Sequence, residues 1–173
     1  MKITLKPISS IDSNVLEELR RRLAQAFGCS VKIMPGIDSL DQSYDSRRGQ
    51  YLAAALLAKL KALGVAKDEK VLGLVDVDLY APGLNFVFGQ ADPAAGIAIV
   101  SLRRLRQEFY GLPPDAPLFL DRATKEAVHE LGHTWSLGHC PNVKCVMHFS
   151  NSLADTDRKQ ATFCSQCCPK LIK

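Results

Sequence analysis

Long hydrophobic runs are missing from this sequence, which excludes a membrane-spanning helix, since such a helix needs about 20 consecutive apolar residues. The first ten residues, MKITLKPISS, also lack the continuous apolar stretch of a secretory signal, because two lysines and a proline interrupt them. Strong charge of one sign is absent too: 22 Lys and Arg against 18 Asp and Glu leave +4, and no aromatic residues interleave the basic ones. We therefore expect a cytoplasmic protein that binds neither membranes nor nucleic acid.

Low-complexity tracts, internal repeats and linkers are also absent, so the chain has no sign of several modules. With 173 residues, 47% hydrophobic and 23% charged, the composition is typical of one globular domain. The character of the sequence changes near Pro117, after the segment GLPPDAP. We expect a single monomeric domain, 1–173, with a strand and helix scaffold in 1–116 and the chemistry in 117–173.

The scaffold alternates short β-branched runs with segments of helical periodicity, which predicts an α/β fold with a mostly parallel, twisted sheet. Two short strands close together in the chain suit an antiparallel strand at the edge of that sheet. A further helix, over 122–135 and capped by Asp121, would carry the residues described next. The expected strands are 3–7, 30–34, 71–79, 85–88 and 97–102, and the expected scaffold helices are 15–27, begun by Asp12 or Ser13, and 52–63.

All four histidines lie between residues 129 and 148, and three of them form a ligand pattern. His129 and His133 stand four residues apart in an HExxH motif, so a helix presents both imidazoles on one face. Zinc favours such nitrogen ligands, and a third ligand from His139 would leave one coordination position open for water, as in a catalytic site. Glu130 is offset around the helix, where its carboxylate can act on that water without binding the metal.

Five of the six cysteines lie between residues 140 and 168 and form a second pattern. Cys140 and Cys145 make one pair, and Cys164 makes another with Cys167 or Cys168, which suits a tetrahedral structural zinc ion. Such an ion would order a tail that has little hydrophobic pattern of its own. Disulfides, which a reducing compartment disfavours, and a nucleic-acid-binding zinc ribbon are the alternatives.

The stretch from His129 to Cys167 resembles the metzincin clan of zinc peptidases, whose signature HExxHxxGxxH precedes a methionine in a tight turn. Met147 matches that methionine. Within the clan, the order His139-Cys140, Cys145-Val146-Met147 and the downstream pair Cys164 and Cys167 is similar to the archaemetzincins. The resemblance favours Cys167 over Cys168 as the fourth thiolate ligand.

The resemblance also implies an extended substrate paired with an antiparallel edge strand, for which order in the chain suggests Asn85, Phe86, Val87 and Phe88. Two positions depart from the clan pattern. Ser136 replaces the glycine that permits a left-handed turn toward the third histidine; a shift of that turn to Gly138 would misplace His139. Phe149 stands where some metzincins have a tyrosine hydroxyl that stabilises the oxyanion.

Together these features predict a metalloprotease with one catalytic and one structural zinc ion. A zinc-bound water would attack the peptide bond while Glu130 acts as the general base, as in zinc hydrolases. The expected substrates are peptides or proteins, and the absence of a visible propeptide suggests narrow specificity or a preference for short peptides. The alternative is a zinc-bearing module that binds peptides with little or no turnover; Glu130 argues against it, because binding alone does not need that carboxylate.

Overall fold

A five-stranded sheet forms the centre of the protein in a computed structural model that describes residues 2–37, 40, 43–66 and 68–172. The strand order is β2-β1-β5-β8-β7. Every neighbouring pair runs parallel except β7 and β8, which run antiparallel at one edge. This arrangement confirms the predicted α/β fold with a mostly parallel sheet and an antiparallel edge strand.

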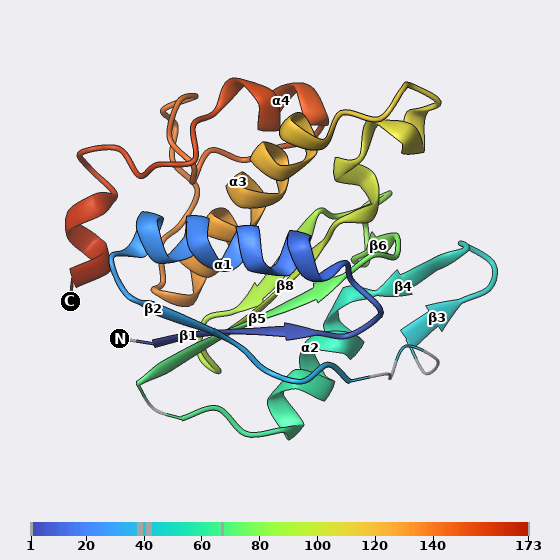
Figure 1. The fold of residues 1–173 in the computed structure, drawn as a ribbon, viewed down its shortest axis with the longest axis horizontal. Helices are drawn as coiled ribbons and strands as arrows, with labels where there is room; N and C mark the ends of the chain where they lie inside the picture. Colours follow the sequence, from blue (N-terminus) through green and yellow to red (C-terminus); the bar gives the residue numbers. More distant parts are fainter. Residues whose placement is uncertain (1, 38–39, 41–42, 67, 173) are drawn as a thin grey trace.

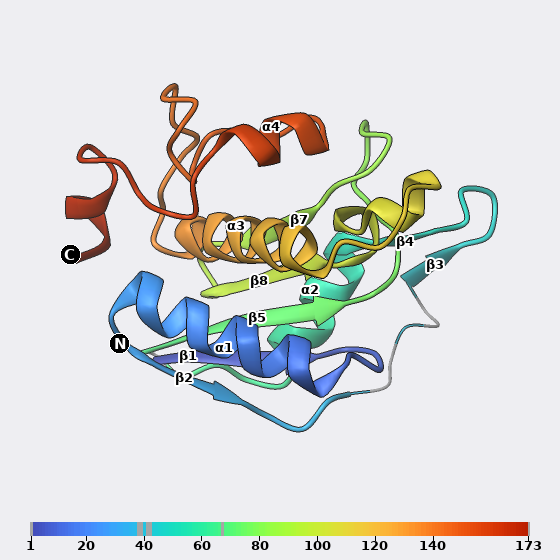
Figure 2. The same ribbon diagram turned by 45° about the horizontal axis from the view of Figure 1, so that its top comes forward.

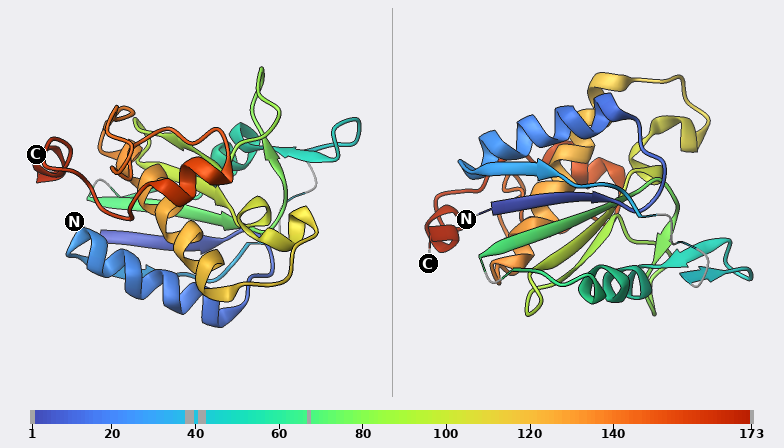
Figure 3. Two further views of the ribbon diagram at one scale, coloured as in Figure 1. Left: turned by 90° about the horizontal axis from the view of Figure 1, so that it is seen from above. Right: turned by 60° about the horizontal axis from the view of Figure 1, so that its bottom comes forward.

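Helices cover both faces of the sheet, with α1 and α3 on one side and α2 on the other (Figures 1 and 2). Helices α1 and α3 share one cluster of buried apolar side chains against the central strands, and α2 covers a second cluster on the opposite face. The runs VLGLV in β5 and IAIVS in β8 are buried on both faces, as expected of central parallel strands. The right-hand view of Figure 3 shows α2 alone beneath the sheet, opposite α1.

The element bounds are as follows. The strands are β1 Lys2–Pro7, β2 Ser30–Ile33, β3 Tyr44–Asp45, β4 Gln50–Leu52, β5 Glu69–Val75, β6 Leu79–Tyr80, β7 Gly89–Asp92 and β8 Ile97–Ser101. The α-helices are α1 Ser13–Phe27, α2 Ala53–Ala62, α3 Ala116–Thr134 and α4 Leu153–Arg158, and short 3-10 helices cover Arg103–Leu105, Gln107–Tyr110 and Cys168–Ile172. None of the helices described is long and apolar enough to cross a bilayer.

Helix α1 begins and ends where its sequence predicts. The carboxylate of Asp12 accepts hydrogen bonds from the backbone N–H groups of Asn14 and Val15, at 2.8 and 3.2 Å. Gly28 closes the helix in the left-handed conformation, at φ 60°. The helix buries its apolar side, including Leu19 and Leu23, against the sheet.

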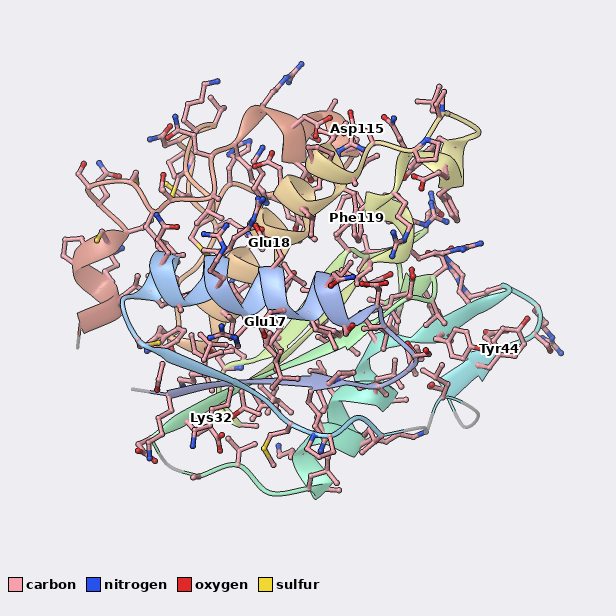
Figure 4. The ribbon with its side chains drawn as sticks, in the orientation of Figure 1. Glu17, Glu18, Lys32, Tyr44, Asp115 and Phe119 are labelled. Atoms are coloured by element: carbon pink, nitrogen blue, oxygen red, sulfur yellow. The ribbon has the colours of Figure 1, made fainter. Side chains whose placement is uncertain are left out.

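Helix α3 starts earlier than predicted. Its N-cap is Asp115, whose carboxylate accepts a hydrogen bond from Leu118 N at 3.0 Å, and the expected cap at Asp121 lies inside the helix. Figure 4 labels Asp115 at this end of α3, with Phe119 one turn further along. Pro117 caused the error: a proline is tolerated in the first turn, where its missing N–H has no helical partner.

The strand predicted at 85–88 is also wrong. Val87 makes one isolated antiparallel bridge to Leu79, and the antiparallel edge strand lies just beyond, at β7. The residues of β7, GQAD, have no hydrophobic alternation, whereas the preceding FVF has apolar side chains that pack beside the cleft. The expected strand over 71–79 is divided as well, into β5 and the short β6, which joins β3 and β4 in a second sheet.

Candidate metal centres and substrate cleft

The last turns of α3 bring His129, Glu130 and His133 to the side of the helix that faces β7 and the cleft. His129 and Glu130 are buried, with 4% and 6% of their surface exposed, and His133 is half-buried. The spacing of four residues puts the two imidazoles on successive turns of one face. Their ring centroids are 4.6 Å apart.

Helix α3 ends in a turn that redirects the chain toward His139. Ser136 N donates to His133 O at 2.8 Å and Leu137 N to Gly132 O at 3.4 Å, which is the bonding pattern of a Schellman motif. Ser136 has φ 60° and is the only non-glycine residue in the described part of the chain with a positive φ. The left-handed turn therefore lies at Ser136 and has not shifted to Gly138.

This turn brings all three histidines together. One ring nitrogen from each of His129, His133 and His139 can be chosen so that the three lie within 4.8 Å of one another. The ring of Phe149 packs against that of His139, with centroids 4.8 Å apart. The position of the metzincin tyrosine is thus occupied by an apolar ring that contacts the third histidine.

Hydrogen bonds to backbone carbonyls settle which nitrogens of His129 and His133 point inward. His129 Nδ1 lies 2.8 Å from Val146 O, and His133 Nδ1 lies 2.7 Å from Leu137 O. A carbonyl only accepts, so each Nδ1 carries the proton and each Nε2 has a free lone pair. These two Nε2 atoms are 3.1 Å apart.

Two lone pairs at that distance repel each other unless a cation lies between them. A proton is disfavoured, because burial lowers the pKa of His133 and takes that of His129 well below its ordinary value. A metal ion satisfies both nitrogens at once, and carbonyl partners on the outer nitrogens are typical of histidine ligands. The donor set therefore fits zinc.

Glu130 lies in a dry and crowded position beside the histidines. Burial and, to a smaller extent, the neighbouring Glu126 raise the pKa of its carboxyl to about 8, against the opposing effect of the Lys159 ammonium. Strand β7 passes directly over it at Gly89, where a Cβ atom would lie 2.5 Å from Glu130 Cγ. Glycine at this position makes room for the carboxylate.

Met147 lies beneath α3, fully buried against Gly132. A Cβ atom on Gly132 would clash with the Met147 sulfur, so the helix and the methionine turn are packed as closely as a glycine allows. Met147 O accepts a hydrogen bond from Cys140 N at 2.9 Å. The turn is thereby tied to the residue that follows His139.

The four cysteines favoured at the sequence level also come together. The Sγ atoms of Cys140, Cys145, Cys164 and Cys167 all lie within 4.8 Å of one another, and those of Cys140 and Cys164 are 3.8 Å apart. Backbone N–H groups of Gln166 and Cys167 lower the pKa of the Cys164 thiol to about 6, which favours a thiolate ligand. This donor set fits a tetrahedral zinc ion. Cys168 is exposed and lies outside the group.

A cavity of about 420 Å³ opens over the histidines. The segment before β7, β7 itself and the segment after Met147 form its walls. Ser150 contributes a buried hydroxyl that has no hydrogen-bond partner among the residues described. The lining residues are Ala81, 84–91, Glu126, His129, Glu130, His133, His139, Phe149, Ser150 and Asn151. The predicted substrate residues 85–88 thus line the cleft, although they are not its edge strand.

Sequence reasoning missed the charged pair beneath this cleft. Lys159 Nζ lies 3.0 Å from Glu126 Oε1, and both side chains are buried. Thr156 Oγ1 donates to the same carboxylate oxygen at 2.8 Å. One signal was available, since Glu126 precedes Glu130 by four residues and so shares its helix face; nothing in the sequence marked Lys159 as its partner.

Comparisons with known proteins agree with this geometry. The family model described as peptidase family M54 matches residues 8–173. The chain is 48% identical to the archaemetzincin of Pyrococcus furiosus, over 98% of this chain and 91% of the relative, and 42% identical to that of Methanocaldococcus jannaschii, over 99% and 93%.

Solved structures are similar as well. A zinc-dependent peptidase from Methanocorpusculum labreanum superposes with a TM-score of 0.90 at 34% identity, covering 98% of this chain and 99% of the other. Archaemetzincin from Archaeoglobus fulgidus, complexed with malonate, superposes with a TM-score of 0.85 at 38% identity, covering 98% and 99%.

Proposed function

The chain belongs to peptidase family M54, the archaemetzincins, and is a zinc-dependent peptidase; from that premise we propose that His129, His133 and His139 hold its catalytic zinc ion and that Glu130 is its general base. The single observation that carries this assignment is the pair of Nε2 atoms 3.1 Å apart, each with its lone pair directed inward. His139 completes a set of three neutral nitrogen ligands.

A zinc ion held by the three histidines would supply an acidified water molecule and polarise the scissile carbonyl group. Glu130 takes the proton from the attacking water and later delivers it to the leaving amine. Its burial keeps the carboxyl away from bulk solvent, and Gly89 provides the space that the Glu130 side chain occupies. Met147 packs under the histidines and binds no metal itself.

We propose that the substrate backbone pairs with β7, which replaces 85–88 as the candidate strand. Ser101 N donates to Phe88 O at 2.8 Å, so in the antiparallel ladder the backbone groups of Gly89 and Ala91 point away from β8. These groups are at the free edge of the sheet and can accept an extended peptide. The Ser150 hydroxyl offers one more hydrogen bond from the other wall.

The apolar lining of the cleft favours short peptides with apolar side chains. Phe86 and Phe88 stack edge to face, with centroids 5.1 Å apart, and Phe149 faces the cleft beside His139. A cavity of about 420 Å³ accommodates only a few residues of a peptide. This is consistent with narrow specificity.

We propose that Cys140, Cys145, Cys164 and Cys167 hold a second zinc ion with a structural role. We further propose that the protein is cytoplasmic, because four thiolates persist as ligands in a reducing compartment. We also propose that it is a monomer. Metal analysis of the purified protein should give two zinc ions per chain.

The test is cleavage of a diverse peptide library by the zinc-loaded protein, read by mass spectrometry, with Glu130→Ala in parallel. We expect cleavage near apolar side chains that falls by about 10²- to 10⁴-fold in the variant while zinc content is unchanged. Cleavage that persists in Glu130→Ala would reject the general-base assignment. A wild-type protein with both metals and no cleavage would favour the peptide-binding alternative.

A further inference from the structure

Lys159 is the largest of the fully buried side chains, and the proposed mechanism does not use it. Its side chain is 0% exposed, whereas lysine almost never leaves solvent completely without a partner. The residue follows α4, in the tail between the methionine turn and the last two cysteine ligands. A buried ammonium group in this position calls for a specific reason.

The contacts of Lys159 join three parts of the protein. Its Nζ lies 3.0 Å from Glu126 Oε1 on α3 and 3.5 Å from the backbone oxygen of His148, the residue directly after Met147. Gln160 N, next along the chain, donates to Lys144 O at 3.0 Å. The tail therefore reaches both the active-site helix and the methionine turn through one side chain.

Both ends of this bridge are close to the chemistry. Glu126 lies one turn before Glu130 on α3, and both residues line the cleft. His148 N donates to Cys145 O at 2.9 Å and its Nδ1 lies 3.0 Å from Cys140 O, so its carbonyl moves with the turn that carries Met147. A displacement of Glu126 or of the His148 carbonyl would therefore shift the histidine nitrogens.

Stability alone is a weak explanation for the pair. Burying two charges costs about as much as their attraction returns, and an apolar pair of the same size is often as stable or more stable. Unlike an apolar contact, the pair is directional, because the Lys159 ammonium holds the Glu126 carboxylate and the His148 carbonyl at fixed distances.

We propose that Lys159 is a positioning residue, which holds the Met147–His148 turn against α3 through Glu126 and so sets the geometry of the proposed catalytic site. The proposal rests on the assignment of the three histidines and Glu130 above. Lys159 contacts neither substrate nor metal; it acts through the two elements that carry the ligands and the methionine floor.

The decisive variant is the double substitution Glu126→Gln with Lys159→Met, because it removes both charges and leaves no uncompensated one. Lys159→Met alone would bury an unpaired carboxylate and so confound position with stability. Lys125→Met is the matched control: this lysine neighbours Glu126 on α3 and its side chain is 8% exposed. It pairs with Asp121 at 2.7 Å, lies 3.5 Å from Asp157 O near the end of α4, and does not line the cleft.

Three quantities are measured on each variant: the unfolding midpoint with the content of both metals, kcat and KM on a cleaved peptide, and the absorption spectrum of Co²⁺ at the histidine site with zinc at the cysteine site. We expect the double variant to fold and to keep both metals. Its kcat should fall about tenfold or more while its KM changes less than about twofold. Its Co²⁺ spectrum should be shifted relative to that of the wild type. Lys125→Met should match the wild type in all three.

Each other outcome also decides the question. Selective loss of metal from the histidine site would support the proposal more strongly. Wild-type kcat and spectrum in the double variant, or global unfolding of it, would overturn the proposal and leave the pair a role in stability alone. The Co²⁺ spectrum needs no turnover, so it separates failure of this inference from failure of the proposed catalytic roles.

Discussion

Replacing Ser136 by glycine should stabilise the protein, because Ser136 occupies the left-handed position of a Schellman motif. A non-glycine residue in that conformation costs about 1–2 kcal/mol. Glycine also makes the unfolded chain more flexible, which offsets about 0.5–1 kcal/mol of that gain. The Ser136 side chain is exposed, so no packing is lost and the net gain is about 0.5–1 kcal/mol.

The assay is the thermal unfolding midpoint of the metal-loaded protein. For a chain of this length a change of 1 kcal/mol moves the midpoint by about 2–4 °C, so Ser136→Gly should raise it by about 1–4 °C. Gly28→Ser is the mirror control: Gly28 has φ 60°, and a Cβ atom there would meet no atom within 4 Å, so it tests the backbone cost alone. That variant should lower the midpoint by a similar amount.

Ser136→Ala separates the backbone from the hydroxyl group. It keeps the Cβ atom in the left-handed conformation, and its midpoint should stay close to that of the wild type. A Ser136→Gly variant no more stable than the wild type, alongside a Gly28→Ser variant with its expected loss, would refute this prediction. Such a result would mean that the turn at Ser136 carries no conformational cost.

Two further predictions follow from close contacts in the two metal centres. Gly89→Ala would place a Cβ atom 2.5 Å from both Glu130 Cγ and Ile99 O. We therefore expect peptidase activity to fall at least about tenfold with both metals retained. Wild-type activity would contradict the conclusion that glycine at this position makes room for Glu130. Cys164→Ser should lose one zinc ion per chain and have a lower unfolding midpoint, as measured by metal analysis and circular dichroism. The control Cys168→Ser should change neither quantity. Two zinc ions retained in Cys164→Ser would refute the ligand assignment.

The candidate metal centres could be predicted because their residues are close in sequence and chemically distinctive. Helical spacing alone puts His129 and His133 on one face, and the cysteine pairs carry their own short spacings. The spacing of the third histidine predicted a sharp turn before His139, and the resemblance to the metzincins pointed to Ser136 as its left-handed residue, with Gly138 as the alternative. The outer hydrogen bonds that orient the imidazoles could not be predicted, since they depend on backbone carbonyls whose positions are set by the fold.

The errors arose where local pattern and tertiary role differ. Strand β7 is polar and lies at the sheet edge, so hydrophobic periodicity pointed to the neighbouring FVF instead. The start of α3 was missed because Pro117 resembles a turn residue yet suits the first helical turn. The pair Glu126 and Lys159 was missed because a charged residue is ordinarily solvated, and only packing of the tail onto α3 buries both.

The two candidate metal centres are mechanically joined, which gives the cysteine cluster a consequence beyond stability. Cys145 immediately precedes Val146, whose carbonyl orients His129 at 2.8 Å and whose N–H donates to Thr162 O at 3.0 Å. Cys140 immediately follows His139 and donates to Met147 O at 2.9 Å. A metal ion held by the four cysteines would thus fix the backbone on which the outer hydrogen bond of His129 and the position of His139 depend. Because the tail has little secondary structure of its own, the cysteine cluster carries much of the order on which the histidine site relies.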